Sequence, residues 1–111
     1  MSPSQVKIDA ERMQAAARQA TSLLHVLANE NRLLLLCQLT QGERCVAELE
    51  DLLDIHQPTL SQQLGVLRSE GLVQTRREGK RIYYSVADRN VLVLLNTLYS
   101  IYCPKPARQC A

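Results

Sequence analysis

Apolar residues in the first two thirds of the chain recur at every third or fourth position, which is the spacing of one helix face. Asn29 is placed to cap the second of these segments, and Gln41 with Gly42 gives a stop signal after it. That segment has leucine at four consecutive positions, so we expect it to be buried on all sides. The pattern predicts helices over residues 13–27, 31–39, 45–53 and 57–69.

The pattern changes after Gly71. Residues 72–76 and 82–86 roughly alternate between apolar and polar side chains and contain strand-forming residues. Between them, residues 77–80 read Arg-Glu-Gly-Lys and form a charged turn, which indicates a β-hairpin with a basic tip. A last helix is predicted from the N-cap Asp88 to about residue 102, where the prolines that follow prevent its continuation.

The predicted order of elements is α-α-α-α-β-β-α, a mainly helical fold with one β-hairpin. Helices 45–53 and 57–69 are joined by a tight turn at 53–56, which is helix-turn-helix geometry. The hairpin that follows makes this a winged helix-turn-helix. The length of 111 residues suits one domain. We expect a flexible N-terminal arm at 1–12, a DNA-binding and dimerisation domain at 13–103, and a loose C-terminal tail at 104–111.

Composition narrows the class of protein. Apolar residues make up 46% of the chain but aromatic residues only 4%, so the core must consist of Leu, Val, Ile and Ala. So short a domain leaves apolar surface uncovered, which favours a homodimer. The sequence has no apolar run long enough to cross a membrane and no signal-peptide core, so we expect a cytoplasmic protein without a membrane partner. Its four cysteines are then thiols in a reducing compartment.

The second helix of the helix-turn-helix carries the expected DNA-reading residues. One face is apolar, and the other bears amide and hydroxyl side chains that can bond base edges or phosphates. A proline in the first turn fits a helix start, where free N–H groups can bind a phosphate. The alternative is an ordinary solvated face. The expected contacts are His56, Gln57, Pro58, Thr59, Ser61, Gln62 and Gln63.

Basic residues cluster directly after that helix. The net charge of +2 is too small to indicate nucleic-acid binding by itself, so the placement of the charges matters. A basic hairpin beside a polar helix suits a wing that grips backbone phosphates, which favours double-stranded DNA as the partner. The residues expected to contact phosphate are Arg68, Arg77, Lys80 and Arg81, and Arg76 belongs to the same cluster.

Three segments make the interpretation more specific: residues 27–33 (LANENRL), 57–64 (QPTLSQQL) and 71–84, which begin GLV and end YY. Over roughly residues 15–103 the chain resembles the ArsR/SmtB family of bacterial winged-helix repressors. The resemblance implies a homodimer formed by the first and last helices. It also implies binding to an inverted-repeat operator and release of that DNA by an inducer.

The metal-sensing sites of that family are incomplete in this chain. Arsenic sensors carry Cys-Val-Cys-Asp-Leu-Cys before the recognition helix, whereas residues 45–50 read CVAELE. One thiolate is too few for a soft trivalent ion. Zinc and nickel sensors use Asp and His on the last helix, where this chain has Asp88 and no histidine. We expect neither a bound metal nor a cofactor, and a metal- or metalloid-responsive repressor is the alternative.

Two other cysteines match a different branch of the family. Cys37 lies near the end of the second helix and Cys103 ends the last one. The pair resembles the two-cysteine branch of sulfide-responsive and biofilm-growth-associated repressors. That resemblance implies sensing of small reactive sulfur species or oxidants through a disulfide or polysulfide bridge. The alternative for Cys37 is a small buried apolar residue. Cys45 and Cys110 fall outside the pair.

The sequence does not suggest an enzyme. A thiol-disulfide oxidoreductase would have Cys-x-x-Cys in a βαβ context, and the sequence has neither. It also has no glycine-rich phosphate loop, nucleophile elbow or paired catalytic carboxylates. A dimeric adaptor with a degenerate winged helix is a third possibility. Such an adaptor should have lost the polar residues of its recognition helix, and this chain has kept them.

Overall fold

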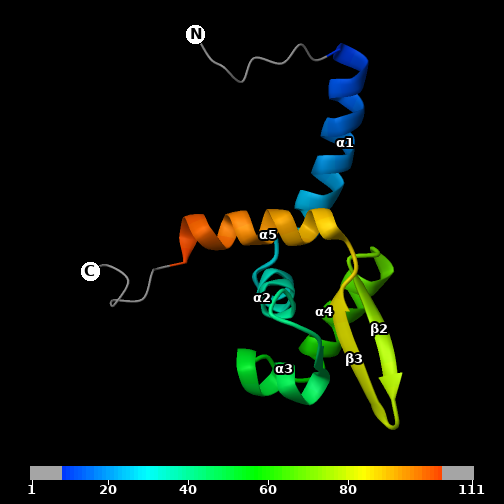
Figure 1. Ribbon diagram of the computed structural model, residues 1–111, viewed down its shortest axis with the longest axis vertical. Helices are drawn as coiled ribbons and strands as arrows, with labels where there is room; N and C mark the ends of the chain where they lie inside the picture. Colours follow the sequence, from blue (N-terminus) through cyan, green and yellow to red (C-terminus); the bar gives the residue numbers. More distant parts are fainter. Residues whose placement is uncertain (1–8, 104–111) are drawn as a thin grey trace, which may run out of the picture.

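The computed structural model describes residues 9–103, which form five helices and a small three-stranded sheet (Figure 1). The winged helix-turn-helix predicted from the sequence is confirmed. The sequence pattern missed one short strand, β1. The elements are α1 (Ala10–Leu27), α2 (Glu30–Leu39), β1 (Arg44–Cys45), α3 (Val46–Leu53), α4 (Thr59–Ser69), β2 (Val73–Glu78), β3 (Arg81–Val86) and α5 (Arg89–Tyr102).

Helix α1 begins earlier than the apolar pattern predicted. The carboxylate of Asp9 accepts a hydrogen bond from the backbone N–H of Glu11 and caps a helix that starts at Ala10 instead of Met13. The first turn escaped notice because its side chains are exposed and follow no apolar spacing. Part of the predicted arm is therefore helical. Residues 1–8 and 104–111, which hold the rest of the predicted arm and the predicted tail, lie outside the described residues.

Polar caps set the starts of α2 and α5 as the sequence indicated. The Asn29 side chain accepts a hydrogen bond from the N–H of Arg32 at 3.0 Å. The Asp88 side chain does the same for Asn90 at 2.8 Å. Each cap satisfies a backbone donor that has no partner within its helix.

Helices α3 and α4 start later than predicted. Cys45 has extended backbone geometry and belongs to β1, so α3 begins at Val46. The Glu48 carboxylate accepts a hydrogen bond from the Cys45 N–H at 2.9 Å and closes this helix start. Gln57 and Pro58 form a turn, so α4 begins at Thr59.

The hairpin is longer than predicted and its turn is shorter. Strands β2 and β3 pair from Val73 opposite Val86 to Glu78 opposite Arg81, which leaves a two-residue turn in place of the expected four. Gly79 in that turn has φ 62°, which glycine adopts without strain. Strand β1 pairs with the other edge of β3, so the strand order is β1-β3-β2.

Leucines from all five helices make most of the core. Helix α2 occupies the centre and contacts α1, α3, α4, α5 and β3. Its predicted burial on all sides is only partly right: Leu35, Leu36 and Leu39 are buried, but Leu34 is 38% exposed. The side chains with almost no exposed surface are Leu35, Leu36, Leu49, Leu60, Leu64, Leu67, Leu95 and Val91.

Helix α1 projects away from the rest of the domain, and α5 crosses near its base (Figure 1). Both helices expose large apolar side chains, which a stable monomer usually covers. Within residues 9–103, no helix is long and apolar enough to cross a membrane. The exposed apolar residues on these two helices are Met13, Leu24, Val93, Tyr99, Ile101 and Tyr102.

Candidate DNA-binding surface and thiol pocket

The turn between α3 and α4 fixes the helix-turn-helix. Asp54 ends α3 in the left-handed backbone region at φ 56°, which Asp tolerates better than most residues. The next residue, Ile55, is buried beneath the turn. Leu60, Leu64 and Leu67 then anchor one face of α4 in the core. These anchors determine which side chains of α4 face outward.

Most of the residues expected to contact DNA in α4 and in the turn before it lie on the outer surface of the protein. Ser61 and Gln62 are exposed, and Thr59 is half-buried. The Ser61 hydroxyl donates to the side-chain oxygen of Gln57, which links the turn to the first turn of α4. The Glu50 carboxylate accepts from the Gln57 N–H at 3.3 Å. The exposed members of the predicted set are His56, Gln57, Pro58, Ser61, Gln62 and, at the other end of α4, Arg68.

Gln63, one of the expected DNA contacts, has a hydrogen-bond partner inside the protein. Its side-chain oxygen accepts a hydrogen bond from Nη1 of Arg32 at 3.0 Å. The same guanidinium donates from Nε to the carbonyl of Val26 at 2.6 Å. Gln63 is half-buried, at the border between the two faces of α4. Helical spacing cannot separate such a border position from a fully outward one.

The wing presents three cationic side chains to solvent. Arg77, Lys80 and Arg81 are exposed around the hairpin turn. Arg77 donates from Nε to the carbonyl of Gly79 at 3.3 Å, a bond within the hairpin itself. In the described part of the chain, no ion pair involves any of these three cations. Their charges are therefore available to an anionic partner.

Arg76 is engaged within the protein. Its guanidinium forms ion pairs with Glu43 and with Glu78, the second at 3.0 Å, and lies 4.8 Å from the ring centroid of Tyr83. The hydrogen bond from Arg76 holds the pKa of the Glu43 carboxyl below its ordinary value. Because Glu43 precedes β1, this contact ties the wing to the body of the domain. The sequence alone places Arg76 in the basic cluster and does not indicate these ion pairs.

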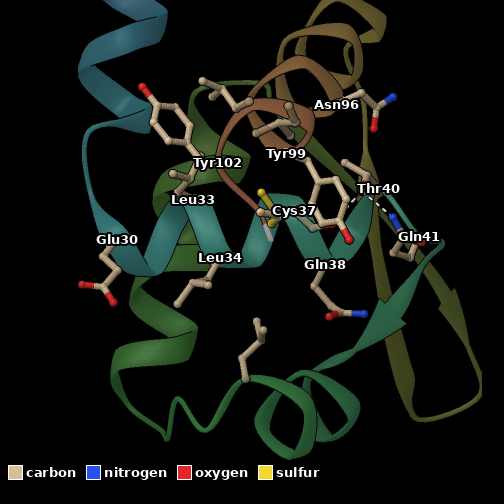
Figure 2. A pocket seen from close by; sticks show the side chains of 14 residues that line it. Glu30, Leu33, Leu34, Cys37, Gln38, Thr40, Gln41, Asn96, Tyr99 and Tyr102 are labelled. Carbon is tan, nitrogen blue, oxygen red and sulfur yellow. Dashed lines mark hydrogen bonds between the residues drawn. The ribbon is translucent and has the colours of Figure 1, made fainter. Parts of the chain in front are cut away.

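A pocket of about 790 Å³ lies between α2 and the C-terminal half of α5 (Figure 2). Leucines and tyrosines form half of its lining, from both helices and from Leu53 of α3. Four uncharged polar residues also line it: Gln38, Thr40, Gln41 and Asn96. Figure 2 shows the Tyr99 ring beside Cys37 and the Glu30 carboxylate at the start of α2. The lining residues also include Leu33, Leu34, Leu95, Leu98, Tyr102 and Cys103.

Both expected sensing thiols line this pocket. Cys37 is half-buried on α2, and Cys103 is exposed immediately after α5. Burial raises the pKa of the Cys37 thiol, and the charge of a Cys103 thiolate raises it further. The two sulfurs are thus close enough for one charge to affect the other. Cys37 packs against the hydrophobic core and also forms part of the pocket wall.

The remaining polar and thiol groups do not form a metal site. Among residues 9–103, no three His, Cys, Asp or Glu side chains come together so that they could hold a metal ion. His25 is exposed on α1, far along the chain from His56. Cys45 is buried at the start of α3 and does not line the pocket. Cys110 lies outside the described residues.

Known proteins resemble this chain over most of its length. A family model described as "Bacterial regulatory protein, arsR family" matches residues 29–75. The biofilm growth-associated repressor of Agrobacterium fabrum is 53% identical over 91 residues, which cover 82% of this chain and 78% of that protein.

Solved structures extend the resemblance to the fold. The crystal structure of the transcriptional repressor BigR from Xylella fastidiosa matches with a TM-score of 0.81 and 46% identity, over 89% of this chain and 100% of that one. The solution structure of a homodimeric winged helix-turn-helix domain from Mycobacterium bovis matches with a TM-score of 0.69 and 34% identity, over 90% and 89% of the two chains.

Proposed function

Because this chain belongs to the ArsR family of bacterial DNA-binding transcription regulators, we propose that it is a homodimeric repressor controlled by a dithiol switch. Reduced protein binds its operator, and a bridge between Cys37 and Cys103 releases it. The observation that carries the proposal is that thiols from the second and the last helix line one pocket. The inducer would be a small reactive sulfur species or an oxidant.

The outward face of α4 and the wing supply the proposed DNA contacts. Ser61 and Gln62 have the hydroxyl and amide groups that bond base edges in the major groove. Arg77, Lys80 and Arg81 supply cations for the phosphates on either side. The relatives described as repressors support the direction of regulation.

The exposed apolar faces of α1 and α5 support a homodimer. Val93 and Ile101 on α5 are 61% and 63% exposed, although both are large and apolar. A second copy would cover these faces, and the Mycobacterium bovis relative is described as homodimeric. A two-fold dimer places two α4 helices on half-sites about one DNA turn (~34 Å) apart, which requires an inverted-repeat operator.

The switch acts through the position of α5. A thiolate attacks one sulfur of a persulfide or polysulfide, the S–S bond breaks, and the other fragment leaves as a thiolate. The second cysteine then displaces the remaining fragment and completes the bridge, so the two thiols lose two electrons and the donor gains them. The bridge joins the end of α5 to α2. If α5 forms the dimer interface, a shift of α5 changes the separation of the two recognition helices. A coupling free energy of ~1–3 kcal/mol between bridge formation and DNA binding would weaken the affinity for DNA ~5–150-fold.

One experiment tests this proposal directly. A DNA duplex is first selected from a random library with reduced protein, and its binding is then measured with and without a polysulfide donor. Mass spectrometry of all four thiols in the same samples identifies the bridge. We expect release that parallels formation of the Cys37–Cys103 bridge. Release by zinc or arsenite but not by polysulfide would establish a metal or metalloid sensor in its place.

A further inference from the structure

We infer that the pocket selects its reactive ligand by polarity, and that the inducer is an uncharged apolar disulfide or polysulfide. An anionic sulfur compound, such as inorganic polysulfide, should react more slowly than an uncharged one of the same type. This inference rests on the proposed function in one respect: it takes Cys37 and Cys103 as the reacting thiols. It adds the chemical class of ligand to which they respond.

The size and lining of the pocket support a small apolar ligand. Its volume of about 790 Å³ falls within the range of small-molecule sites, roughly 300–1,000 Å³. Five leucines from α2, α3 and α5 and the rings of Tyr99 and Tyr102 form the apolar part of the wall. The uncharged polar side chains of the lining are Gln38, Thr40, Gln41 and Asn96. An anionic ligand would lose water here without gaining a cationic partner among the described lining residues.

The charged side chain that lines the pocket disfavours the binding of anionic ligands in particular. Of the described residues that line the pocket, Glu30 is the one with an ionisable side chain apart from the tyrosines and cysteines. Its carboxylate lies at the start of α2, on the same side of the pocket as Tyr102 (Figure 2). Among residues 9–103, no lysine or arginine lines the pocket to offset that negative charge. An anionic donor would therefore be repelled, whereas a neutral one would not.

The placement of the two thiols gives the pocket a role in the reaction. Cys103 is exposed at the pocket edge, but Cys37 is half-buried in its wall, so a reagent reaches Cys37 through the pocket. Burial raises the pKa of the Cys37 thiol. Cys103 is the more exposed of the two thiols, so a donor that arrives from solvent meets Cys103 first. The apolar group of the donor can then occupy the pocket while it is attached to Cys103.

Both steps balance as thiol-disulfide exchange. The Cys103 thiolate attacks R–S–S–R′, the S–S bond breaks, and R′–S⁻ leaves and takes a proton. The Cys37 thiol gives its proton to water, and the resulting thiolate attacks the Cys103 sulfur and expels R–S⁻. The two cysteines lose two electrons and two protons, and the donor becomes R–SH and R′–SH. A trisulfide reacts in the same way and releases one persulfide.

A matched pair of donors tests the inference. Dipropyl disulfide is uncharged, and dithiodipropionate has the same three-carbon arms, each ending in a carboxylate. The rate of Cys37–Cys103 bridge formation in the reduced full-length protein is measured by mass spectrometry for each donor. Each rate is divided by the rate for the uncharged thiol N-acetylcysteine methyl ester. We expect the corrected ratio to favour dipropyl disulfide by about tenfold or more.

Three variants locate the selectivity. Glu30→Gln should speed the reaction with dithiodipropionate and leave that with dipropyl disulfide unchanged. Leu34→Asn, in the pocket wall, should slow the reaction with dipropyl disulfide. Leu52→Asn is the matched control, because Leu52 is 52% exposed and does not line the pocket. Circular dichroism and binding of reduced protein to the selected duplex confirm that each variant is folded.

The outcomes separate this inference from the proposed function. A corrected ratio close to one in wild-type protein overturns selection by polarity, even if the bridge releases DNA. A high ratio that Glu30→Gln and Leu34→Asn leave unchanged also overturns it, because the pocket is then not its source. If the pocket selects the apolar donor but bridged protein keeps its DNA, the proposed switch is wrong and the selectivity stands.

Discussion

Arg32 and Gln63 join α2, the helix that carries Cys37, to α4, the proposed recognition helix, through a hydrogen bond of 3.0 Å from Nη1 to the amide oxygen. The same guanidinium also holds the carbonyl of Val26 at the end of α1. One side chain therefore links α1, α2 and α4. This contact helps to fix the rotation of α4 about its axis, and with it the outward direction of Ser61 and Gln62.

Neighbouring glutamines on α4 are expected to behave differently. Gln62→Ala should lower the preference for the selected duplex over random DNA by about 1–3 kcal/mol, because an exposed amide reads a base edge. Gln63→Ala should instead lower the free energy of unfolding by about 0.5–1.5 kcal/mol, because it loses the bond from Arg32. Fluorescence anisotropy and urea unfolding measure the two effects. Equal losses on selected and random DNA in Gln62→Ala would make Gln62 a backbone contact.

The wing should act through charge. Replacing Arg77 and Arg81 together by alanine should weaken binding to all DNA sequences similarly, and the slope of log affinity against log salt should flatten by about one to two units. Arg76→Met is the control, since its guanidinium is already paired with Glu43 and Glu78. Its slope should stay close to that of the wild type. An unchanged slope in the double variant would exclude this grip on phosphate.

The sequence predicted the helices and the core residues better than it predicted the contacts between residues far apart along the chain. Regular spacing placed Leu60, Leu64 and Leu67 inward, and all three are buried. Strand β1 escaped notice because two residues are too few to show alternation. The pair between Arg76 and Glu43 joins positions 33 residues apart, so no local pattern reports it.

The thiol site could likewise be predicted only in part from the sequence. Resemblance to a family branch singled out Cys37 and Cys103, but a pocket exists only once the chain has folded. Its apolar walls come from three helices, and the sequence pattern shows them only as ordinary core positions.

Dimerisation should depend on the outer face of α5. We expect wild-type protein to sediment as a dimer at micromolar concentration in both redox states. Val93→Asp should yield monomer and lose most affinity for the selected duplex, because it places a charge in an apolar interface. Leu52→Asp on α3 is the control and should remain dimeric. A wild-type monomer would contradict the proposed assembly, and a covalent dimer through Cys37 or Cys103 would contradict a bridge within one protomer.

The pH dependence of Cys37 has a definite sign. Burial raises its pKa, so its alkylation by iodoacetamide should still be increasing above about pH 8.5, the ordinary value for free cysteine. Cys103→Ser removes the second cause, the neighbouring thiolate, and should lower the midpoint without restoring it fully. Because folding favours the neutral thiol, its contribution to stability is complete below the unfolded pKa and declines as pH rises through the folded one. A midpoint below that of an unfolded cysteine peptide would contradict this assignment.

The switch itself should require two thiols acting in sequence. We expect Cys37→Ser and Cys103→Ser each to abolish most of the release by polysulfide, and the double variant to resemble each single one. Cys45→Ser and Cys110→Ser should respond like the wild type, because Cys45 does not line the pocket and Cys110 is not part of the proposed pair. The measurement is the affinity for the selected duplex before and after treatment.

The comparison of single and double variants distinguishes a bridge from two separate sensors. A bridge needs one sulfur to attack and another to capture the intermediate, so losing either removes the same product. Independent sensors would instead give losses that add. Because a hydroxyl at position 37 can cost about 1–3 kcal/mol where it lacks a partner, the affinity of each reduced variant is measured first. A Cys37→Ser protein that binds the duplex normally and still releases it with polysulfide would show that modification of Cys103 alone is sufficient, and the two-thiol switch would be wrong.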